Sequence, residues 1–493
     1  MERLKRGAGV LMPVFALPSK GGIGTLGKEA YEFVDWLSKA GMKYWQVLPL
    51  GITSFGDSPY QSPSAYAGNP YFIDIDNLVA KGLLERSEVT FYAVSDSDKV
   101  DYEAIYEKRY ALLRLSYDRF DVKDKDYVKF CRDNKAWLDD YALFAALKVK
   151  YDVHNTWHSW PLDIRYRKKS AIAKVKKELA GEMGFYSYMQ FMFYSDFMKL
   201  KAYAHEKGIS IIGDMPLYVA YDSADVWSDP KQFLLDENLN MTVVAGCPPD
   251  CFSADGQKWG NPIYDWKYAK STGYEWFTGR VKRLNKLYDI IRIDHFIGIV
   301  KYYNIPFDKS AVHGYYKVGP GGALVSAILD AVPEVKLIAE DLGVYMPKTG
   351  AILEKYGIPN MKVTAFAFDS DASNDHLFHN HKANQVVYIG THDNDTLMGQ
   401  LSDMGAKTRR YMEAYLEAST DEEIHERMIR SLYASVADVA VFQVQDLLMK
   451  GREYRTNYPS TIGGNWKLRI KKGELTASLA RHMKELAITY GRL

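Results

Sequence analysis

The chain has 493 residues, of which 47% are hydrophobic and 25% are charged, a composition typical of an ordinary globular protein. Its 63 basic and 62 acidic residues nearly cancel, which excludes the broad charged surface expected of a protein that binds nucleic acid or an anionic membrane. The three cysteines Cys131, Cys247 and Cys251 are too few for a disulfide framework, which favours a reducing, cytoplasmic location.

The first element in the chain is a short apolar run that imitates a signal peptide, because Arg3, Lys5 and Arg6 precede it. Pro13 interrupts this run, however, and residues 26–41 follow directly with the pattern of an amphipathic helix. We interpret the run as the first strand of the core. We find no apolar stretch that approaches the roughly 18 residues of a membrane span, so we expect neither export nor anchoring.

The glycines of "GGIGTLG" at residues 21–27 raise the possibility of a dinucleotide site, because Gly22, Gly24 and Gly27 have the G-x-G-x-x-G spacing. Such a site also needs an acidic side chain at the end of the next strand, to bind a ribose hydroxyl. The next strand ends instead in "LPL" at residues 48–50. The sequence therefore predicts no nicotinamide or flavin, and we expect no cofactor.

Farther along, short apolar runs alternate with helical patterns. The candidate strands are residues 9–13, 44–50, 210–216, 290–295, 336–341, 362–367, 385–391 and 439–444. Strands that alternate with helices in this number predict a (β/α)8 TIM barrel. The spacing is uneven, so we expect inserted subdomains in one catalytic barrel over residues 1–493: a helical and loop insertion at about 51–180, and an active-site loop region at about 217–285.

The second insertion contains a run rich in Gly and Pro at residues 245–266, which has the character of a functional loop. Cys247 and Cys251 lie in it, but no second pair with ligand spacing follows them. The run "DSDASND" at residues 369–375 resembles a calcium-binding loop, yet Asn374 stands where that loop needs glycine. We predict no metal site.

Charged residues end four of the eight apolar runs, although a buried strand has no need of them. They are Asp214, the Arg292 and Asp294 pair, Glu340 with Asp341, and His392 with Asp393. The C-terminal strand ends of a barrel meet at one face, and Arg292 can keep Asp294 ionised there. One such residue alone is more often a structural ion pair. Four at one pole repel each other and are costly to desolvate, which indicates a catalytic site.

Two close carboxyl groups, one ionised and one protonated, are what a retaining glycosidase-type reaction requires. Aromatic residues make up 14% of the chain, and flat rings with a polar edge can stack on sugars. Most of these rings must be ordinary core. Tyr60 and Trp259 are the more informative ones, because they lie among loop-forming residues.

Eight segments, in this order, resemble the amylomaltases or disproportionating enzymes, which are 4-α-glucanotransferases of the α-amylase clan. The segments are "GIGTLG", "SPYQSPSAYAGNPY", "GDMPLYVA", "PPDCFSADGQKWGNPIY", "RIDHF", "AEDLG", "GTHDNDT" and "GGNW". The resemblance covers nearly the whole chain and implies that Asp294 is the nucleophile, Glu340 the general acid/base and Asp393 the transition-state stabiliser. It implies a donor-sugar site lined by Tyr60, Asp214, Arg292, Asp341, His392 and Asn465, with Trp259 on a loop that covers it.

Two positions depart from the family pattern: Ile297 stands where arginine is frequent, and Ala16 where serine is common. Neither belongs to the catalytic trio. The expected activity is the transfer of an α-1,4-glucan segment to the 4-hydroxyl of another glucan. An α-glucan hydrolase is the alternative within the same class, because the trio serves both reactions. A glucan-binding protein without catalysis is the alternative from another class, and a poised acid argues against it.

Overall fold

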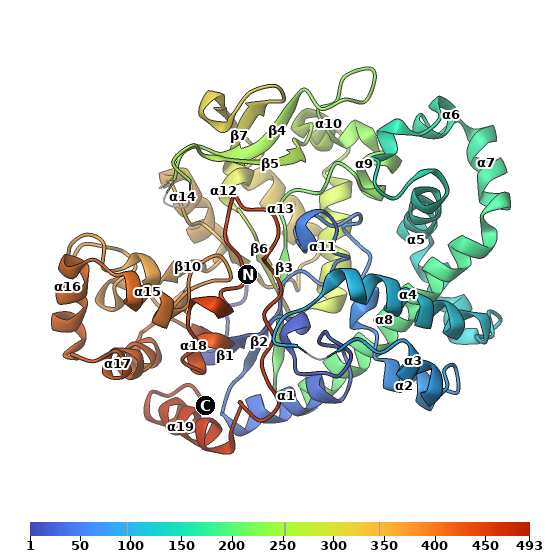
Figure 1. Ribbon diagram of the computed structural model, residues 1–493. Helices are drawn as coiled ribbons and strands as arrows, with labels where there is room; N and C mark the ends of the chain where they lie inside the picture. Colours follow the sequence, from blue (N-terminus) through green and yellow to red (C-terminus); the bar gives the residue numbers. More distant parts are fainter. Residues whose placement is uncertain (96, 251–252, 345) are drawn as a thin grey trace.

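The computed structural model describes residues 1–95, 97–250, 253–344 and 346–493. Eight parallel strands close into a barrel in which each strand pairs with the next along the chain and the last pairs with the first (Figure 1). They are β1 (Gly7–Leu11), β2 (Tyr44–Gln46), β3 (Ser210–Met215), β6 (Ile290–Ile293), β9 (Leu337–Ala339), β10 (Asn360–Val363), β11 (Gln385–Tyr388) and β12 (Val439–Gln443). Each predicted strand overlaps one of them, so the barrel is confirmed.

The strands form where they do because both of their faces are covered. All residues of β1, β6, β11 and β12 are buried, as expected for parallel strands with side chains inside the barrel and helices outside it. Helix α1 (Lys28–Lys39) shows the complementary pattern, because Ala30, Phe33, Val34 and Leu37 form one buried stripe. Burial of that stripe stabilises the packing of α1 on the outside of the barrel.

The glycine-rich turn before α1 has a packing role. A Cβ atom at Gly24 would lie 1.8 Å from the backbone oxygen of Val14, and one at Gly27 would lie 1.8 Å from a carboxylate oxygen of Asp74. Only glycine permits these approaches. The spacing that resembles a dinucleotide fingerprint is therefore explained by close contact between neighbouring segments.

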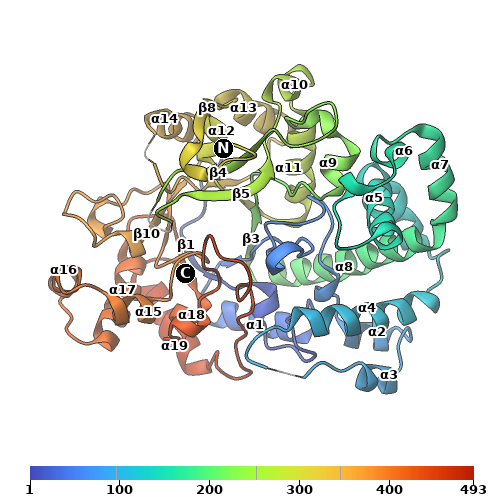
Figure 2. The same ribbon diagram turned by 45° about the horizontal axis from the view of Figure 1, so that its top comes forward.

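Between β2 and β3 the chain builds a helical layer on one side of the barrel, at the right of Figure 1 and most separate from it in Figure 2. Its helices are α2 (Ile75–Ala80), α3 (Arg86–Phe91), α4 (Tyr102–Asp118), α5 (Lys125–Tyr151), α6 (Leu162–Arg165), α7 (Lys169–Glu178) and α8 (Ala180–Glu206). The long helices α5 and α8 pack along each other. The predicted boundaries of this insertion, 51–180, stay a prediction.

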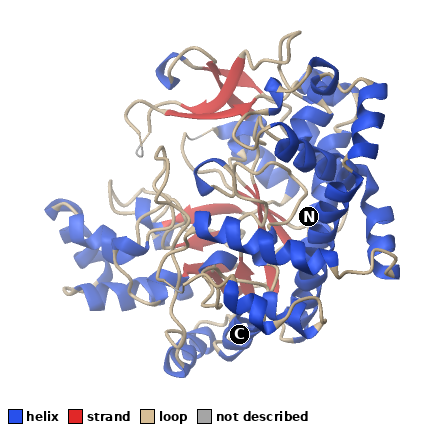
Figure 3. Ribbon diagram, turned by 45° about the vertical axis from the view of Figure 1, so that its right-hand side comes forward, coloured by secondary structure: helices blue, strands red, loops and turns tan. Residues whose placement is uncertain are grey.

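A second sheet stands over the barrel, and Figure 3 shows it as a separate group of strands. Its order is β5 (Gln257–Pro262), β4 (Val243–Cys247), β7 (Lys301–Pro306) and β8 (Tyr315–Val318), all antiparallel. The expectation of a loop over residues 245–266 was wrong for residues 245–247 and 257–262, because β4 and β5 pair there as antiparallel strands. Their Gly and Pro residues hide the pattern of a strand, and pairing with the distant β7 supplies the missing stabilisation.

The remaining helices complete the ring around the barrel and its C-terminal lobe. They are α9 (Ala224–Ser228), α10 (Trp266–Ser271), α11 (Glu275–Leu287), α12 (Ile297–Val300), α13 (Gly322–Ala331), α14 (Pro347–Tyr356), α15 (Leu397–Asp403), α16 (Ala406–Leu416), α17 (Asp421–Ala434), α18 (Val444–Leu447) and α19 (Ala477–Thr489). In the described part of the chain, none of the helices combines the length and apolar character needed to cross a membrane. The boundaries 217–285 also stay a prediction.

Candidate active site

Arg292 on β6 is the centre of the polar cluster at the C-terminal end of the barrel. Asp214 on β3 is its register partner, so the two side chains leave adjacent strands on the same side. Arg292 Nη1 donates to both carboxylate oxygens of Asp214 at 2.7 and 2.8 Å, and to Asp294 Oδ1 at 3.0 Å. One guanidinium therefore holds two carboxylates in fixed positions.

The two carboxylates bound by Arg292 differ in accessibility. The side chain of Asp214 is 0% exposed, whereas that of Asp294 is 26% exposed. A nucleophile has to reach its substrate, so Asp294 can attack a bound ligand while Asp214 can only support it. Asp294 follows directly after β6, and its backbone N–H donates to the carbonyl of Met215, which fixes this turn.

Glu340 follows β9 and lies nearly buried beside Asp294. Burial, helped by the negative charge of Asp294 and opposed by Arg292, raises the pKa of Glu340 to about 8. Its oxygens also accept backbone N–H groups, Oε2 from His295 at 2.7 Å and Oε1 from Leu342 at 2.8 Å. At neutral pH Glu340 is therefore a protonated acid in a fixed orientation beside a carboxylate.

His295 supplies one of those N–H groups from an unusual backbone conformation. Its φ is +48°, in the left-handed region that a residue with a side chain seldom adopts. Burial lowers the pKa of His295 to about 4, and its neutral ring lies at 84° to the ring of Trp259 with centroids 4.8 Å apart. Asp294 and His295, two consecutive residues, thus lie next to both Glu340 and the ring of Trp259.

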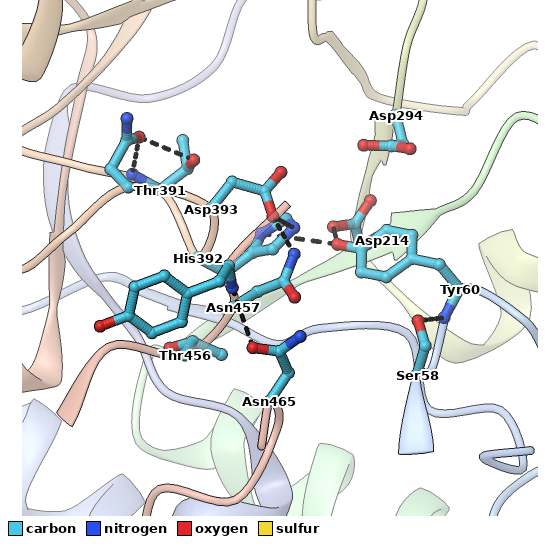
Figure 4. A network of polar contacts seen from close by, with 12 residues as sticks. Ser58, Tyr60, Asp214, Asp294, Thr391, His392, Asp393, Thr456, Asn457 and Asn465 are labelled. Atoms are coloured by element: carbon cyan, nitrogen blue, oxygen red, sulfur yellow. Dashed lines mark hydrogen bonds and ion pairs between the residues drawn. The ribbon is translucent and has the colours of Figure 1, made fainter. Parts of the chain in front are cut away.

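Tyr60 and His392 form the floor on the other side of Asp214 (Figure 4). The Tyr60 hydroxyl donates to Asp214 Oδ2 at 2.8 Å, and it lies 3.5 Å from His392 Nδ1. The two rings stack at 5.1 Å between centroids, and Trp466 packs against both. This group offers a flat apolar surface with polar edges, the kind of surface that a sugar ring can contact.

Asp393 is the third carboxylate around the same space, as Figure 4 shows. Asn457 Nδ2 donates to its Oδ1 at 2.6 Å, and His392 Nε2 lies 3.4 Å from that same oxygen. Arg455 donates to the backbone oxygen of Asp393 at 2.5 Å. The side chain of Asp393 is 37% exposed. One of its carboxylate oxygens is therefore held in place while the group still reaches the cleft.

Two predicted sugar-contacting residues are bonded to neighbouring protein groups. Asp341 accepts from Asn360 Nδ2 at 2.9 Å and from the backbone N–H of Met361 at 3.2 Å. Asn465 accepts from the backbone N–H of Tyr458 at 3.0 Å and donates to Thr461 Oγ1 at 3.1 Å. Both side chains therefore brace the walls of the site, and their contact with a sugar stays a prediction.

Sequence reasoning missed His295, Asn457 and Trp466, which contact the residues of the site, and Gln61, which lies outside the site and bonds the backbone of Trp259. Gln61, His295 and Trp466 each lie within a motif quoted for the family resemblance, and adjacency to a predicted site residue was the available signal. Asn457 lies outside those motifs. Among the residues that the structure describes, no group of three or more His, Cys, Asp or Glu side chains is placed to hold a metal ion, and Cys251 and Phe252 lie outside them.

Comparison with known proteins gives one consistent result. Residues 12–476 match the family model described as 4-alpha-glucanotransferase. The chain is 45% identical over 486 residues to a 4-alpha-glucanotransferase of Clostridium butyricum, covering 98% of this chain and 100% of the relative. It is 40% identical over 503 residues to a 4-alpha-glucanotransferase of Thermus thermophilus, covering 99% and 100% of the two chains.

Solved structures agree with the sequence comparison. An amylomaltase from Streptococcus agalactiae in complex with acarbose superposes with a TM-score of 0.95 at 38% identity, covering 99% of this chain and 100% of that one. The amylomaltase from Corynebacterium glutamicum superposes with a TM-score of 0.79 at 17% identity, covering 99% of this chain and 75% of that one. The second similarity concerns the fold alone.

Proposed function

Because this chain belongs to the 4-alpha-glucanotransferase family and has that activity, we propose that Asp294, Glu340 and Asp393 carry out its retaining double displacement. The observation that supports this most directly is the contrast between two adjacent carboxyl groups. Asp294 is accessible and paired with Arg292, whereas burial raises the pKa of Glu340 to about 8. A nucleophile and a general acid need these opposite properties.

In the first step, Glu340 donates its proton to the glycosidic oxygen while Asp294 attacks the anomeric carbon. The bond to the leaving glucan breaks, and that glucan departs with a new 4-hydroxyl. The retained segment is joined to Asp294 through an ester bond. Asp393 bonds the ring hydroxyls and stabilises the positive charge that develops on the ring.

In the second step, the ionised Glu340 takes a proton from the 4-hydroxyl of an acceptor glucan, and that oxygen displaces Asp294. One bond is broken and one is formed, with retention at the anomeric carbon. We propose maltooligosaccharides and longer α-1,4-glucans as donors and acceptors. Tyr60, Asp214, Arg292, Asp341, His392 and Asn465 would line the donor site. The scarcity of cysteine supports a cytoplasmic location.

Trp259 is proposed to cover the cleft, so that a sugar acceptor reaches the glycosyl enzyme more readily than water. Its ring lies nearly perpendicular to the ring of His295, the neighbour of the nucleophile. With maltotriose alone, the protein should release glucose and form maltopentaose and longer chains while the number of reducing ends stays nearly constant. Replacing Trp259 with alanine should raise the fraction of hydrolysis.

The assay compares glucose release with the increase in reducing ends over the same period. In a transferase the first greatly exceeds the second, because each broken bond is remade. If the wild-type protein increased the number of reducing ends as fast as it released glucose, it would be a hydrolase with the same catalytic trio. An unchanged ratio in the Trp259→Ala variant would show that Trp259 has no covering role.

A further inference from the structure

Two segments that contact the cleft come from distant parts of the chain. The first is the Tyr60 loop (residues 51–69), which follows β2 and whose Tyr60 bonds Asp214. The second is β5, which carries Trp259 above His295. Trp259 contacts His295, the residue that follows the nucleophile Asp294. A group that joins the two segments therefore fixes the position of Trp259 relative to Asp294.

Strand β5 is irregular at the position of Trp259. Val244 pairs with Pro262 and Gly246 pairs with Lys258, so residues 259–261 of β5 lie opposite the single residue Ala245. This is a β-bulge, a device that redirects a side chain and takes its backbone out of the ladder. Gly260 within it has a φ of +79°, and no atom lies within 4 Å of the place where its Cβ would stand. An anchor from outside the sheet can fix the position of such a bulge.

Gln61 provides this anchor. Its Nε2 donates to the backbone oxygen of Trp259 at 3.2 Å and to Asn261 Oδ1 at 3.0 Å. In return, Asn261 Nδ2 donates to Gln61 Oε1 at 3.4 Å and also to the backbone oxygen of Val219 at 2.8 Å. Asn261 is 5% exposed. The two amides thus form a mutual pair that joins the Tyr60 loop, the Trp259 bulge and the segment after β3.

The chemistry of this contact requires amides. A primary amide offers donors and an acceptor on one planar group, so two of them can exchange hydrogen bonds in both directions. A carboxylate at position 61 would face two oxygen acceptors with no proton to donate. The carboxylate could still accept the bond from Asn261 Nδ2, but both bonds that Gln61 Nε2 donates would be lost.

We propose that the Gln61–Asn261 amide pair is a positioning latch, which fixes the Trp259 bulge to the Tyr60 loop and so favours a sugar acceptor over water. This inference rests on the proposed covering role of Trp259. Gln61 itself acts through Trp259 and takes no part in bond breaking. Loss of the latch should therefore leave cleavage of the donor largely intact while a larger share of the glycosyl enzyme reacts with water.

The test uses maltotriose and the wild-type protein, Gln61→Ala, Gln61→Glu, Trp259→Ala and the double variant Gln61→Ala/Trp259→Ala. Gln61→Glu has nearly the shape of the native side chain, and it tests the latch if Gln61→Ala folds poorly. Lys258→Ala is the matched control, because this exposed neighbour of Trp259 on β5 bonds the backbone of Phe307 and Lys309, away from the cleft. The readout is the ratio of hydrolysis to total cleavage.

We expect each single Gln61 variant to raise this ratio by about fivefold, the effect of losing roughly one hydrogen bond, with total cleavage changed by less than about twofold. Lys258→Ala should leave the ratio unchanged. In the Trp259→Ala background, Gln61→Ala should add almost nothing, because its effect passes through Trp259.

Three results would overturn the latch. If Trp259→Ala raises the ratio and the Gln61 variants do not, the latch is wrong and the covering role stands. If Gln61→Ala has the same effect with and without Trp259, Gln61 acts by another route. If neither variant changes the ratio, the covering role fails and the latch fails with it.

Discussion

Glu340 combines two opposing influences in one side chain. Two backbone N–H groups favour its ionised form, but burial and the charge of Asp294 outweigh them and raise its pKa to about 8. The same residue can therefore give a proton at neutral pH and still be held in place once it has become a carboxylate. This dual requirement is what a residue that acts first as acid and then as base must meet.

Replacing Glu340 with glutamine keeps the shape of the side chain and removes the transferable proton. We expect glucan binding to persist while turnover falls by about 100 to 10,000-fold, the usual contribution of general acid/base catalysis. Binding by calorimetry and turnover with maltotriose measure the two effects separately. Turnover above a tenth of the wild-type value with normal binding would assign the acid to another residue.

The pH dependence of activity follows from the same carboxyl group. Activity requires protonated Glu340, so it should decline as the pH rises through about 8. Arg292 lowers the pKa of Glu340, so Arg292→Met should move this alkaline decline to higher pH, whereas Arg292→Lys, which keeps the charge, should move it less. Profiles of kcat/KM against pH measure the shift. If Arg292 only braces the barrel, stability should fall and the alkaline decline should stay in place.

At the scale of the element, the position of Asp214 along strand β3 depends on the ring of Tyr288, which packs directly on the backbone of Gly213. A Cβ atom at Gly213 would lie 2.0 Å from Cδ2 of Tyr288, a buried residue just before β6. Only glycine allows β3 and the entry to β6 to approach this closely. The register that places Asp214 beside Arg292 thus depends on a residue without a side chain.

Gly213→Ala should lower the free energy of unfolding by about 1–3 kcal/mol, the usual cost of overpacking a core. Gly279→Ala in α11 is the matched control, because no atom lies within 4 Å of its added Cβ. There alanine should stabilise by roughly 0.5–1 kcal/mol through its higher helix propensity. Denaturant unfolding of both variants gives the comparison, and equal effects would show that the contact with Tyr288 does not constrain β3.

Elements differed in how far the sequence could predict them. The barrel strands were predictable because each is an apolar run between helical patterns. The hairpin of β4 and β5 was not, because its pairing with β7 joins residues far apart in the chain and its glycines and prolines resemble a loop. Local composition reports local preference, and these strands depend on long-range partners.

At the scale of the whole molecule, the site is assembled from segments spread over most of the chain. Three segments far apart in sequence contact the strand ends of the barrel: the Tyr60 loop through Asp214, the Trp259 bulge through His295, and the segment of Asn457 through Asp393. Carboxylates at strand ends were predictable because barrel topology brings those ends together. Asn457 was not, because hydrogen bonds between loops have no periodicity in sequence, and for Gln61 the only signal was its place next to Tyr60.

The central claim is that Asp294 forms a covalent bond to the sugar and Glu340 serves the steps on either side. A maltotriosyl fluoride of α configuration tests it with the Glu340→Gln variant, because fluoride leaves without protonation while the second step lacks its base. Mass spectrometry of the digested protein should then find a maltotriosyl group on the peptide that contains Asp294, at the Asp294 carboxylate. A sugar attached to Asp214 or Asp393, or fluoride release with no attached sugar, would contradict the account.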